Sequence, residues 1–498
     1  MSVSSISSTP NALVQSLMDM RAQFDDLQRQ LSTGQKSATY AGLGSGRGLS
    51  VSLNAQLSAI AGFDDSIDMV GTRLQLAQTA LGGMTNIGDN MKALVVQGDS
   101  TGGNTSSAQL TAQSSLQQLL GLLNTQAGGR YLFSGSATDQ PSVESYDHII
   151  NGDGARAGLK QLIGERAQAD LGASGLGRLV VSAPTGTSVA LAEDAVSPFG
   201  FKLASVSSGL TNATVTGPSG APASLTVDMS GGLPNAGDTL TIRLNMPDGT
   251  SENLTLTATA QSPPGTNQFT IGATPAATAS NLQAALSTSL GNLAASSLRA
   301  ASATTASNDF FGADLNNPPP RVAGPPFDTA TAMTAGTTAD TVVWYTGDAS
   351  ATPPRGTATT RIDPALVVSY GARANETGIR TLVQNVATLA AVTLSPTDPN
   401  QANFTSALGQ RIGAGLGGAP GQQTVTDIEA ELAGLQSAMA EVKSQHQQTA
   451  ATLNGMVQQI SGVSNEQVGA ELLTLQTRMQ ASMQTTAMLY QMSLVNFL

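Results

Sequence analysis

Both ends of the chain carry apolar residues at every third or fourth position with polar residues between them, which is the pattern of amphipathic helices. The C-terminal segment, residues 463–498, shows it over its whole length. Chain termini normally fray in water, so an apolar helix at the end of a chain is unusual. We therefore expect this helix to pack against the other terminus or another subunit. An ordinary core helix is the alternative. The apolar face consists of Val468, Leu472, Leu475, Met479, Met483, Tyr490, Leu494 and Phe497.

A first helix is predicted over residues 12–32. Its apolar residues form two interleaved rows with a spacing of seven, as in the seam of a coiled coil. The tetrapeptide Leu31-Ser32-Thr33-Gly34 is interpreted as its end, since glycine commonly terminates helices. The two rows are Leu13, Met20 and Leu27, and Leu17, Phe24 and Leu31.

A glycine-rich segment, residues 40–50, is predicted to be a flexible link to the next helix. It has neither the Gly-Lys-Ser/Thr of a phosphate-binding loop nor the glycine spacing of a dinucleotide fingerprint, so no cofactor is expected there. The next helix, residues 51–97, would be roughly 70 Å long, which indicates a rod. A turn at residues 99–105 and a third helix at residues 106–126 complete an antiparallel hairpin of helices.

The strongest periodicity predicts a fourth long helix over residues 426–463, with Thr426 and Glu429 as its capping box. His446 lies on the apolar face of this helix. We interpret it as a polar residue that fixes helix register, with a ligand role as the alternative. The pattern breaks near residues 462–464, as the N-terminal pattern breaks at the glycine-rich segment. The two ends of the chain are therefore predicted to pair as matching two-part helices.

The composition changes over residues 141–357, where helical periodicity nearly vanishes and short alternating runs take its place. Residues 239–259 predict a β-hairpin around Pro247-Asp248-Gly249. Further strands are predicted at residues 223–229 and 341–345. A helix is predicted at residues 278–298, and a proline-rich loop at residues 316–326 divides the region.

The chain then returns to helices. Residues 361–370 predict a strand, and residues 375–392 and 403–415 predict helices, before a linker at residues 417–423. The predicted fold class is α+β and multidomain: a long coiled-coil rod built from both ends of the chain, with an inserted β-rich outer module. The expected domains are an inner terminal coiled coil (1–42 with 463–498), a helical rod (43–140 with 424–462), the β-rich module (141–357) and a returning segment (358–423).

Composition removes several classes of function. The chain has no cysteine and only two histidines, His148 and His446, so thiolate sites, zinc sites and Ser-His-Asp catalysis are not expected. The formal net charge of −12 disfavours nucleic acid and anionic membrane surfaces as partners. No apolar run is long enough to cross a membrane. We therefore expect no enzyme, no metal and no cofactor.

The N-terminal residues show no basic segment followed by an apolar one, so no cleaved signal peptide is expected. A cytoplasmic protein is the simple interpretation. Export by another route is the alternative, and the cysteine-free composition, rich in serine and threonine, suits an extracellular protein.

Several of these segments resemble the bacterial flagellin superfamily, which includes filament flagellins and hook-associated proteins. The terminal Ser493-Leu494-Val495-Asn496-Phe497-Leu498 is similar to the family's apolar ending. Leu31-Ser32-Thr33-Gly34 matches the family's Leu-Ser-Ser/Thr-Gly. The segment Tyr131-Leu132-Phe133-Ser134-Gly135, followed by Thr138-Asp139, resembles the hook-associated protein 3 group of hook–filament junction proteins. The chain lacks the Ile-Asn-Thr-Asn opening and the Asp-Asp-Ala-Ala-Gly loop common in filament flagellins.

This resemblance implies a structural subunit that polymerises through its terminal helices, which are disordered in the monomer and fold on assembly. It also implies export through the flagellar type III apparatus, an extracellular location on the flagellum, and copies of the chain, neighbouring flagellar subunits and an export chaperone as partners. A filament flagellin is the near alternative. An enzyme carried on the filament and a surface adhesin with a coiled-coil stalk are further alternatives. The implied assembly seam consists of the six residues of the two N-terminal rows and the eight residues of the C-terminal face named above.

Overall fold

The computed structural model describes residues 8–101, 105–395 and 397–495, and the side chains of residues 12–96, 107–395 and 397–488. The chain divides into two compact units. Unit 1 comprises residues 1–71, 361–368 and 436–498, and unit 2 comprises residues 72–360 and 369–435. Two long helices, α2 (Arg47–Thr101) and α10 (Val425–Ser461), run from one unit into the other.

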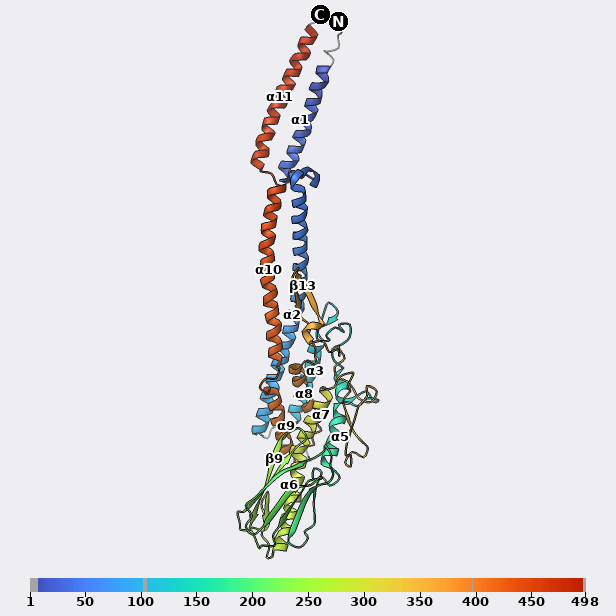
Figure 1. Ribbon diagram of the computed structural model, residues 1–498, viewed down its shortest axis with the longest axis vertical. Helices are drawn as coiled ribbons and strands as arrows, with labels where there is room; N and C mark the ends of the chain where they lie inside the picture. The colour runs from blue at the N-terminus through green and yellow to red at the C-terminus, as the bar shows by residue number, and fades with distance from the viewer. Residues whose placement is uncertain (1–7, 102–104, 396, 496–498) are drawn as a thin grey trace. The chain divides into compact units, whose positions relative to one another are not determined.

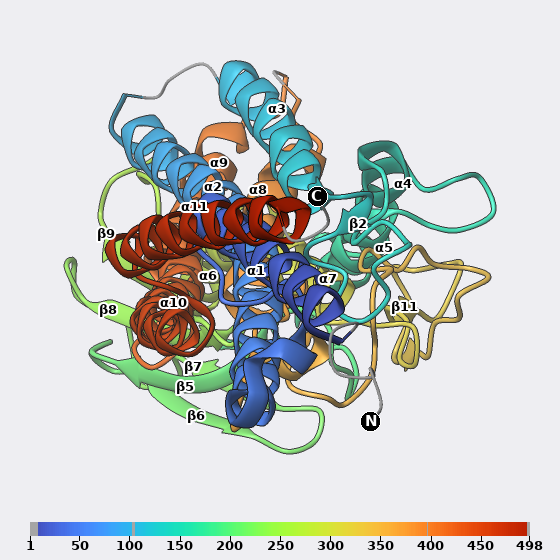
Figure 2. The same ribbon diagram turned by 90° about the horizontal axis from the view of Figure 1, so that it is seen from above.

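Unit 1 is built from helices contributed by both ends of the chain. Helix α1 (Ser8–Thr33) packs against α11 (Asn465–Val495), and the two lie side by side (Figures 1 and 2). A short 3₁₀ helix, η1 (Tyr40–Gly46), leads into α2. The long helices form because apolar residues recur at helical spacing, so one stripe of each can be buried.

The breaks in the two terminal patterns lie beside one another. The N–H of Lys36 donates to the carbonyl of Ser461 at 2.7 Å, and the N–H of Val463 donates to the carbonyl of Gly34 at 3.1 Å. Gly34 has a φ of +66°, the left-handed conformation in which glycine ends helices. The predicted pairing of two-part helices from both ends is therefore confirmed at this point.

The helices of unit 2 pack around small and apolar side chains. Pairs in contact include α3 with α8, α5 with α7, and α7, α8 and α9 with one another. The buried residues of α5 and α7 explain why no amphipathic pattern in the sequence predicts these two helices. Helix α5 buries three charged residues, and α7 buries mainly alanine and serine. The helices are α3 (Thr105–Leu123), α4 (Tyr146–Asn151), α5 (Leu159–Leu171), α6 (Pro275–Leu293), α7 (Arg299–Phe311), α8 (Thr377–Ala391) and α9 (Gln401–Gly417).

Two four-stranded sheets form the β-rich part of unit 2. Their strand orders are β10-β9-β8-β5 and β3-β4-β7-β6, antiparallel except for the β9–β10 pair. The strands are β3 (Leu179–Val181), β4 (Ser188–Glu193), β5 (Lys202–Ser208), β6 (Thr214–Ser219), β7 (Ser224–Asp228), β8 (Thr239–Asn245), β9 (Ser251–Thr259) and β10 (Gln268–Thr270).

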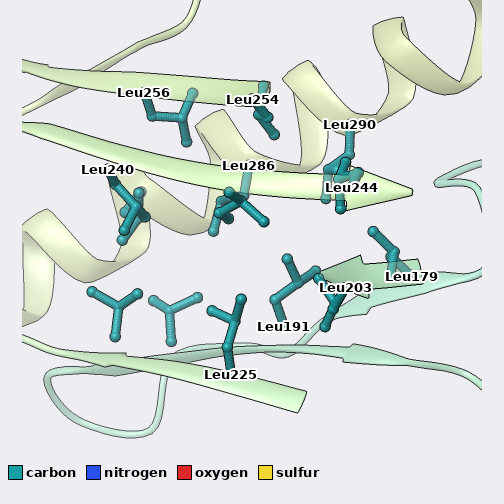
Figure 3. Packing of buried hydrophobic residues seen from close by; sticks show 14 of the residues in the cluster. Leu179, Leu191, Leu203, Leu225, Leu240, Leu244, Leu254, Leu256, Leu286 and Leu290 are labelled. Atoms are coloured by element: carbon teal, nitrogen blue, oxygen red, sulfur yellow. The ribbon is translucent and has the colours of Figure 1, made fainter. Parts of the chain in front are cut away.

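Helix α6 completes the core between these sheets. It contacts β3 and β4 of one sheet and β9 and β10 of the other. Leu286 and Leu290 of α6 point among leucines from both sheets, which Figure 3 shows. Alternation along β8 and β9 aims every second residue inward, so Leu240, Leu256 and their neighbours are fully buried.

Short elements connect these parts. A π-helical segment, η2 (Ala294–Leu298), joins α6 to α7, and a 3₁₀ turn, η3 (Pro354–Thr357), precedes the return of the chain. Three two-stranded sheets remain: β1 (Gln126–Ala127) with β2 (Arg130–Tyr131), β11 (Arg321–Val322) with β12 (Met333–Thr334), and β13 (Thr359–Asp363) with β14 (Leu366–Ser369).

The predicted α+β class with long terminal helices and a β-rich insertion is confirmed. So is the hairpin at residues 239–259, which forms as β8 and β9. The helices predicted at residues 375–392 and 403–415 form as α8 and α9. The helix predicted at residues 278–298 forms as α6 and the η2 segment.

Other local predictions were wrong. Residues 341–345 form no strand, because their backbone makes single bonds, such as Val342 N–H to the Ala157 carbonyl at 3.0 Å, instead of a ladder. Residues 361–370 form two strands around Pro364. The glycine-rich segment is largely helical, since η1 and the start of α2 occupy it.

Over residues 141–357 the only helix predicted was that at residues 278–298, and the structure adds three helices there, α4, α5 and α7. The start of α10 differs too. The hydroxyl of Thr424 accepts the N–H of Asp427 at 3.2 Å, and the Asp427 carboxylate accepts the N–H of Thr424 at 2.8 Å. The capping box is therefore Thr424 with Asp427, not Thr426 with Glu429.

Candidate assembly interface

The N-terminal rows face the C-terminal helix within unit 1. Leu13, Leu17, Met20, Phe24 and Leu27 are half-buried along α1, while the residues between them are exposed. Leu31 ends the series and is 43% exposed. The structure thus brings five of the six predicted residues to one stripe of α1, and this stripe lies along the α1–α11 contact.

Helix α11 presents a matching stripe. Val468 and Leu475 are buried, and Leu472 and Met479 are half-buried. Beyond Met479 the stripe continues through Ser482 and Thr486, whereas Met483 is 52% exposed. The heptad register of α11 therefore places a serine, not Met483, toward α1 at that level.

Three predicted residues of the C-terminal face fall where no side chain is described. Phe497 lies outside the described residues. The backbone of Tyr490 and Leu494 belongs to α11, and their side chains lie outside the described ones. Their place in the seam stays a prediction.

The helices α1 and α11 also bound a groove of about 380 Å³. Its lining includes the apolar Leu27 from α1 and Leu475 from α11 beside the polar Gln23, Gln467 and Thr474. Glu471 and Arg478 stand at its rim. The pairing of α1 with α11 therefore leaves apolar and charged groups accessible to a third helix.

The outer surface of these helices is unusual for a face in water. Val14 and Met18 on α1 and Leu473, Met483 and Met488 on α11 are all exposed. Helix α11 contains no charged residue after Arg478. The part of α11 beyond Arg478 thus combines exposed methionines with an absence of charged residues, which makes it a candidate for contact with a partner.

His446 of α10 is buried in unit 1. Its Nδ1 lies 2.8 Å from Asp64 Oδ1 on α2, and its Nε2 lies 3.4 Å from Asp363 Oδ2 on β13. The ring of Phe63 lies 6.1 Å away, centroid to centroid. A buried polar side chain with fixed partners sets helix register, which fits the role inferred for His446. The sequence could not identify Asp64 and Asp363 as its partners.

The segment Tyr131–Gly135 is a buried structural element of unit 2. Phe133 is fully buried and its carbonyl accepts the N–H of Ala374 at 2.8 Å. The N–H of Gly135 donates to the carbonyl of Ala372 at 3.1 Å. Gly135 has a φ of +67°, and a Cβ there would lie 2.9 Å from the Cβ of Asp348. Glycine is therefore required at position 135 both by the left-handed backbone conformation and by the close approach of Asp348.

Asp348 anchors the same segment through Arg373. The guanidinium of Arg373 donates to Asp348 Oδ2 at 2.7 Å, and both side chains are nearly buried. Burial alone would raise the pKa of the Asp348 carboxyl, but hydrogen bonds from Ser350, Ser136 and Arg373 outweigh it and hold that pKa well below its usual range.

Over residues 8–101, 105–395 and 397–495, no cluster of three or more histidine and carboxylate side chains is arranged to hold a metal ion. Within the same ranges no helix is both long and apolar enough to cross a membrane.

The geometry of unit 1 defines a protein whose terminal helices pair along an apolar seam. Residues 6–138 match the family model of the bacterial flagellin N-terminal helical region. This range holds α1, η1, α2, α3 and the β1–β2 hairpin. Over this range the chain is similar to the N-terminal helical region of bacterial flagellins. No curated protein matches the chain.

Proposed function

We propose that this chain is a hook–filament junction protein, similar to hook-associated protein 3, which polymerises through its terminal helices. The observation that carries polymerisation is the exposed surface of α11 beyond Arg478, which has no charged residue, together with the apolar α1–α11 seam. Exposure of such a face to water is unfavourable. Its burial against another subunit would stabilise the assembly by about 25 cal/mol per Å² of apolar surface.

The proposed mechanism couples folding to assembly. Isolated helices of this length are marginal in water, so the terminal coiled coil (1–42 with 463–498) would be disordered in the free monomer and would fold as subunits stack. The remaining parts are proposed as a helical rod (43–140 with 424–462), an outer β-rich module (141–357) and a returning segment (358–423). All fourteen seam residues predicted from the sequence belong to this proposal.

The junction role is supported by two sequence features. The segment Tyr131–Gly135 resembles junction proteins. The N-terminus lacks the Ile-Asn-Thr-Asn opening, and the glycine-rich segment lacks the Asp-Asp-Ala-Ala-Gly loop, both of which are common in filament flagellins. The proposed partners are copies of the chain, the neighbouring hook-associated proteins and flagellin, and an export chaperone that covers the terminal helices before secretion. Export without a cleaved signal peptide belongs to the same proposal.

Self-assembly of the purified protein tests the role directly. The monomer is mixed with short seeds of its own or with isolated hook ends, and the products are viewed by electron microscopy. Binding to hook ends followed by acceptance of flagellin supports the junction role. Growth of long filaments from the protein alone makes it a filament flagellin instead.

A matched pair of substitutions tests the use of the terminal helices. Leu475→Ser removes a buried seam residue, and Leu473→Ser removes an exposed one two positions away. We expect both variants to lose incorporation, but only Leu475→Ser to weaken α1–α11 pairing, measured by hydrogen exchange. Normal incorporation of both variants, or of a chain truncated before Leu494, contradicts the mechanism.

A further inference from the structure

Among the described side chains, five methionines are between 38% and 69% exposed, and all five lie on helices within unit 1. Unit 1 also holds the half-buried Met20 and Met479 and the buried Met439. In unit 2, Met84, Met91, Met229 and Met246 are buried, and Met333 is half-buried. The exposed set is Met18, Met69, Met456, Met483 and Met488.

The rest of the chain offers few competing sites for an oxidant. There is no cysteine, and the single tryptophan, Trp344, is fully buried. Thioether sulfurs are therefore the most easily oxidised groups that water reaches on the described side chains, and they gather on the helices proposed to assemble.

We propose that these five methionines are sites of reversible oxidation by hydrogen peroxide, and that their oxidation in the monomer blocks assembly. The inference rests on the proposed function, because it assigns a regulation to helices of the proposed assembly: Met18, Met483 and Met488 lie on the terminal helices, and Met69 and Met456 lie on α2 and α10 of the proposed rod. It also predicts a protected state, since burial of these helices between subunits would shield the sulfurs.

The chemistry is a two-electron oxygen transfer. A lone pair of the thioether sulfur attacks one peroxide oxygen, the S–O bond forms as the O–O bond breaks, and the second oxygen leaves as water after proton transfer. The sulfur is oxidised and the peroxide is reduced. Methionine sulfoxide reductases reverse the step with thiols, which become a disulfide while the oxygen leaves as water.

Oxidation to the sulfoxide makes the helix surface more polar, which opposes its burial between subunits. Methionine is a flexible apolar side chain that adapts to irregular interfaces, and the sulfoxide is polar and chiral. Met483 and Met488 lie on the part of α11 beyond Arg478, which carries no charged residue, and Met18 lies on α1, so each sulfoxide would have to be buried without a matched partner.

The test compares three forms of the full chain. The wild type, a leucine variant, and a control carrying Met84→Leu and Met229→Leu are each treated with hydrogen peroxide as monomers. In the leucine variant the five exposed methionines are changed together with Met20, Met479 and Met492, because the proposed monomer leaves the terminal helices unfolded. Leucine keeps the volume and the helix preference. Peptide mass mapping locates each added oxygen, and seeded assembly is followed by light scattering.

We expect oxygen at the five exposed methionines before the buried ones, and an assembly rate lowered about tenfold or more in the wild type and the control. The leucine variant should assemble at the same rate before and after peroxide, and a sulfoxide reductase should restore the wild type. Equal loss of assembly in the leucine variant overturns the proposal.

Failure of the proposed function is seen separately. If untreated wild type does not assemble, the assembly mechanism is wrong, and the peptide map still decides the modification. Equal oxidation of exposed and buried methionines in that map overturns the assignment of the sites.

Discussion

The imidazole of His446 and the carboxylate of Asp64, 382 positions apart in the chain, lie 2.8 Å from each other in unit 1. Asp64 is the nearer of the two carboxylates that face the His446 ring, since Asp363 Oδ2 lies 3.4 Å from Nε2. This pair joins α10 to α2 at one register.

The first prediction concerns this pair. In a double-mutant cycle of His446→Ala and Asp64→Ala, we expect a coupling of roughly 1 kcal/mol in the free energy of unfolding, because the bond is partly shielded from water. Chemical denaturation measures it. The cycle of His446→Ala with Asp65→Ala, the next and exposed residue of α2, should show no coupling within about 0.5 kcal/mol. Equal coupling in both cycles would remove the register role.

The second prediction separates two candidate caps of α10. Thr424→Ala should lower the free energy of unfolding by about 1 kcal/mol, because the Thr424 hydroxyl accepts the N–H of Asp427. Thr426→Ala should cost less than about 0.5 kcal/mol, since Thr426 is exposed and caps no backbone group in the described hydrogen bonds. Denaturant midpoints of the two variants decide the matter, and a larger loss for Thr426→Ala would restore the cap predicted from sequence.

The third prediction concerns Gly135. Gly135→Ala places a Cβ 2.9 Å from the Cβ of Asp348 at a φ of +67°. Gly129 has a φ of +75° with open space around it, so Gly129→Ala carries only the conformational cost of about 1–2 kcal/mol. We expect Gly135→Ala to cost at least about 1 kcal/mol more, measured by thermal unfolding. Similar losses in both variants would mean that Asp348 moves aside freely.

The fourth prediction concerns acid. The pKa of Asp348 is lowered in the folded chain, so the unfolded chain binds its proton first. The stability from this carboxylate is present above the unfolded pKa of about 3.9 and is lost as pH falls further. At neutral pH, Asp348→Asn should cost about 3 kcal/mol, because Arg373 stays buried without its charge partner.

The measurement is urea unfolding of both forms from neutral pH to about pH 2. The difference in free energy of unfolding between wild type and Asp348→Asn should shrink below about pH 4. Protonation removes the negative charge of Asp348 in the wild type, and the substitution has already removed it in the variant. A difference that stays constant over this range would assign the stabilisation to packing.

Long helices were predictable because their buried stripe follows from their own spacing. Leu432, Met439 and Leu453 of α10 lie on the predicted face and are buried. The hairpin around Pro247-Asp248-Gly249 was predictable for a similar reason, since turn chemistry and alternation are both local.

Elements stabilised by distant partners were not predictable. Helix α5 buries Glu165, Arg166 and Asp170, and Glu165 is satisfied by Arg321 on β11. A sequence pattern places such residues in water. Residues 341–345 also depend on a distant partner, because Trp344 donates its indole N–H to the carbonyl of Phe311 at 2.9 Å. The sequence pattern predicted a strand there instead.

The sequence by itself determined which faces of the terminal helices are apolar, where those helices break, and that the middle of the chain holds β structure. Tertiary structure decided that Gly34 and Val463 meet, that Asp64 and Asp363 face His446, and that Asp348 packs against the Tyr131–Gly135 segment. The physical reason is range: periodicity and turn chemistry act over a few residues, whereas a buried polar group is satisfied by whichever distant group the fold brings to it.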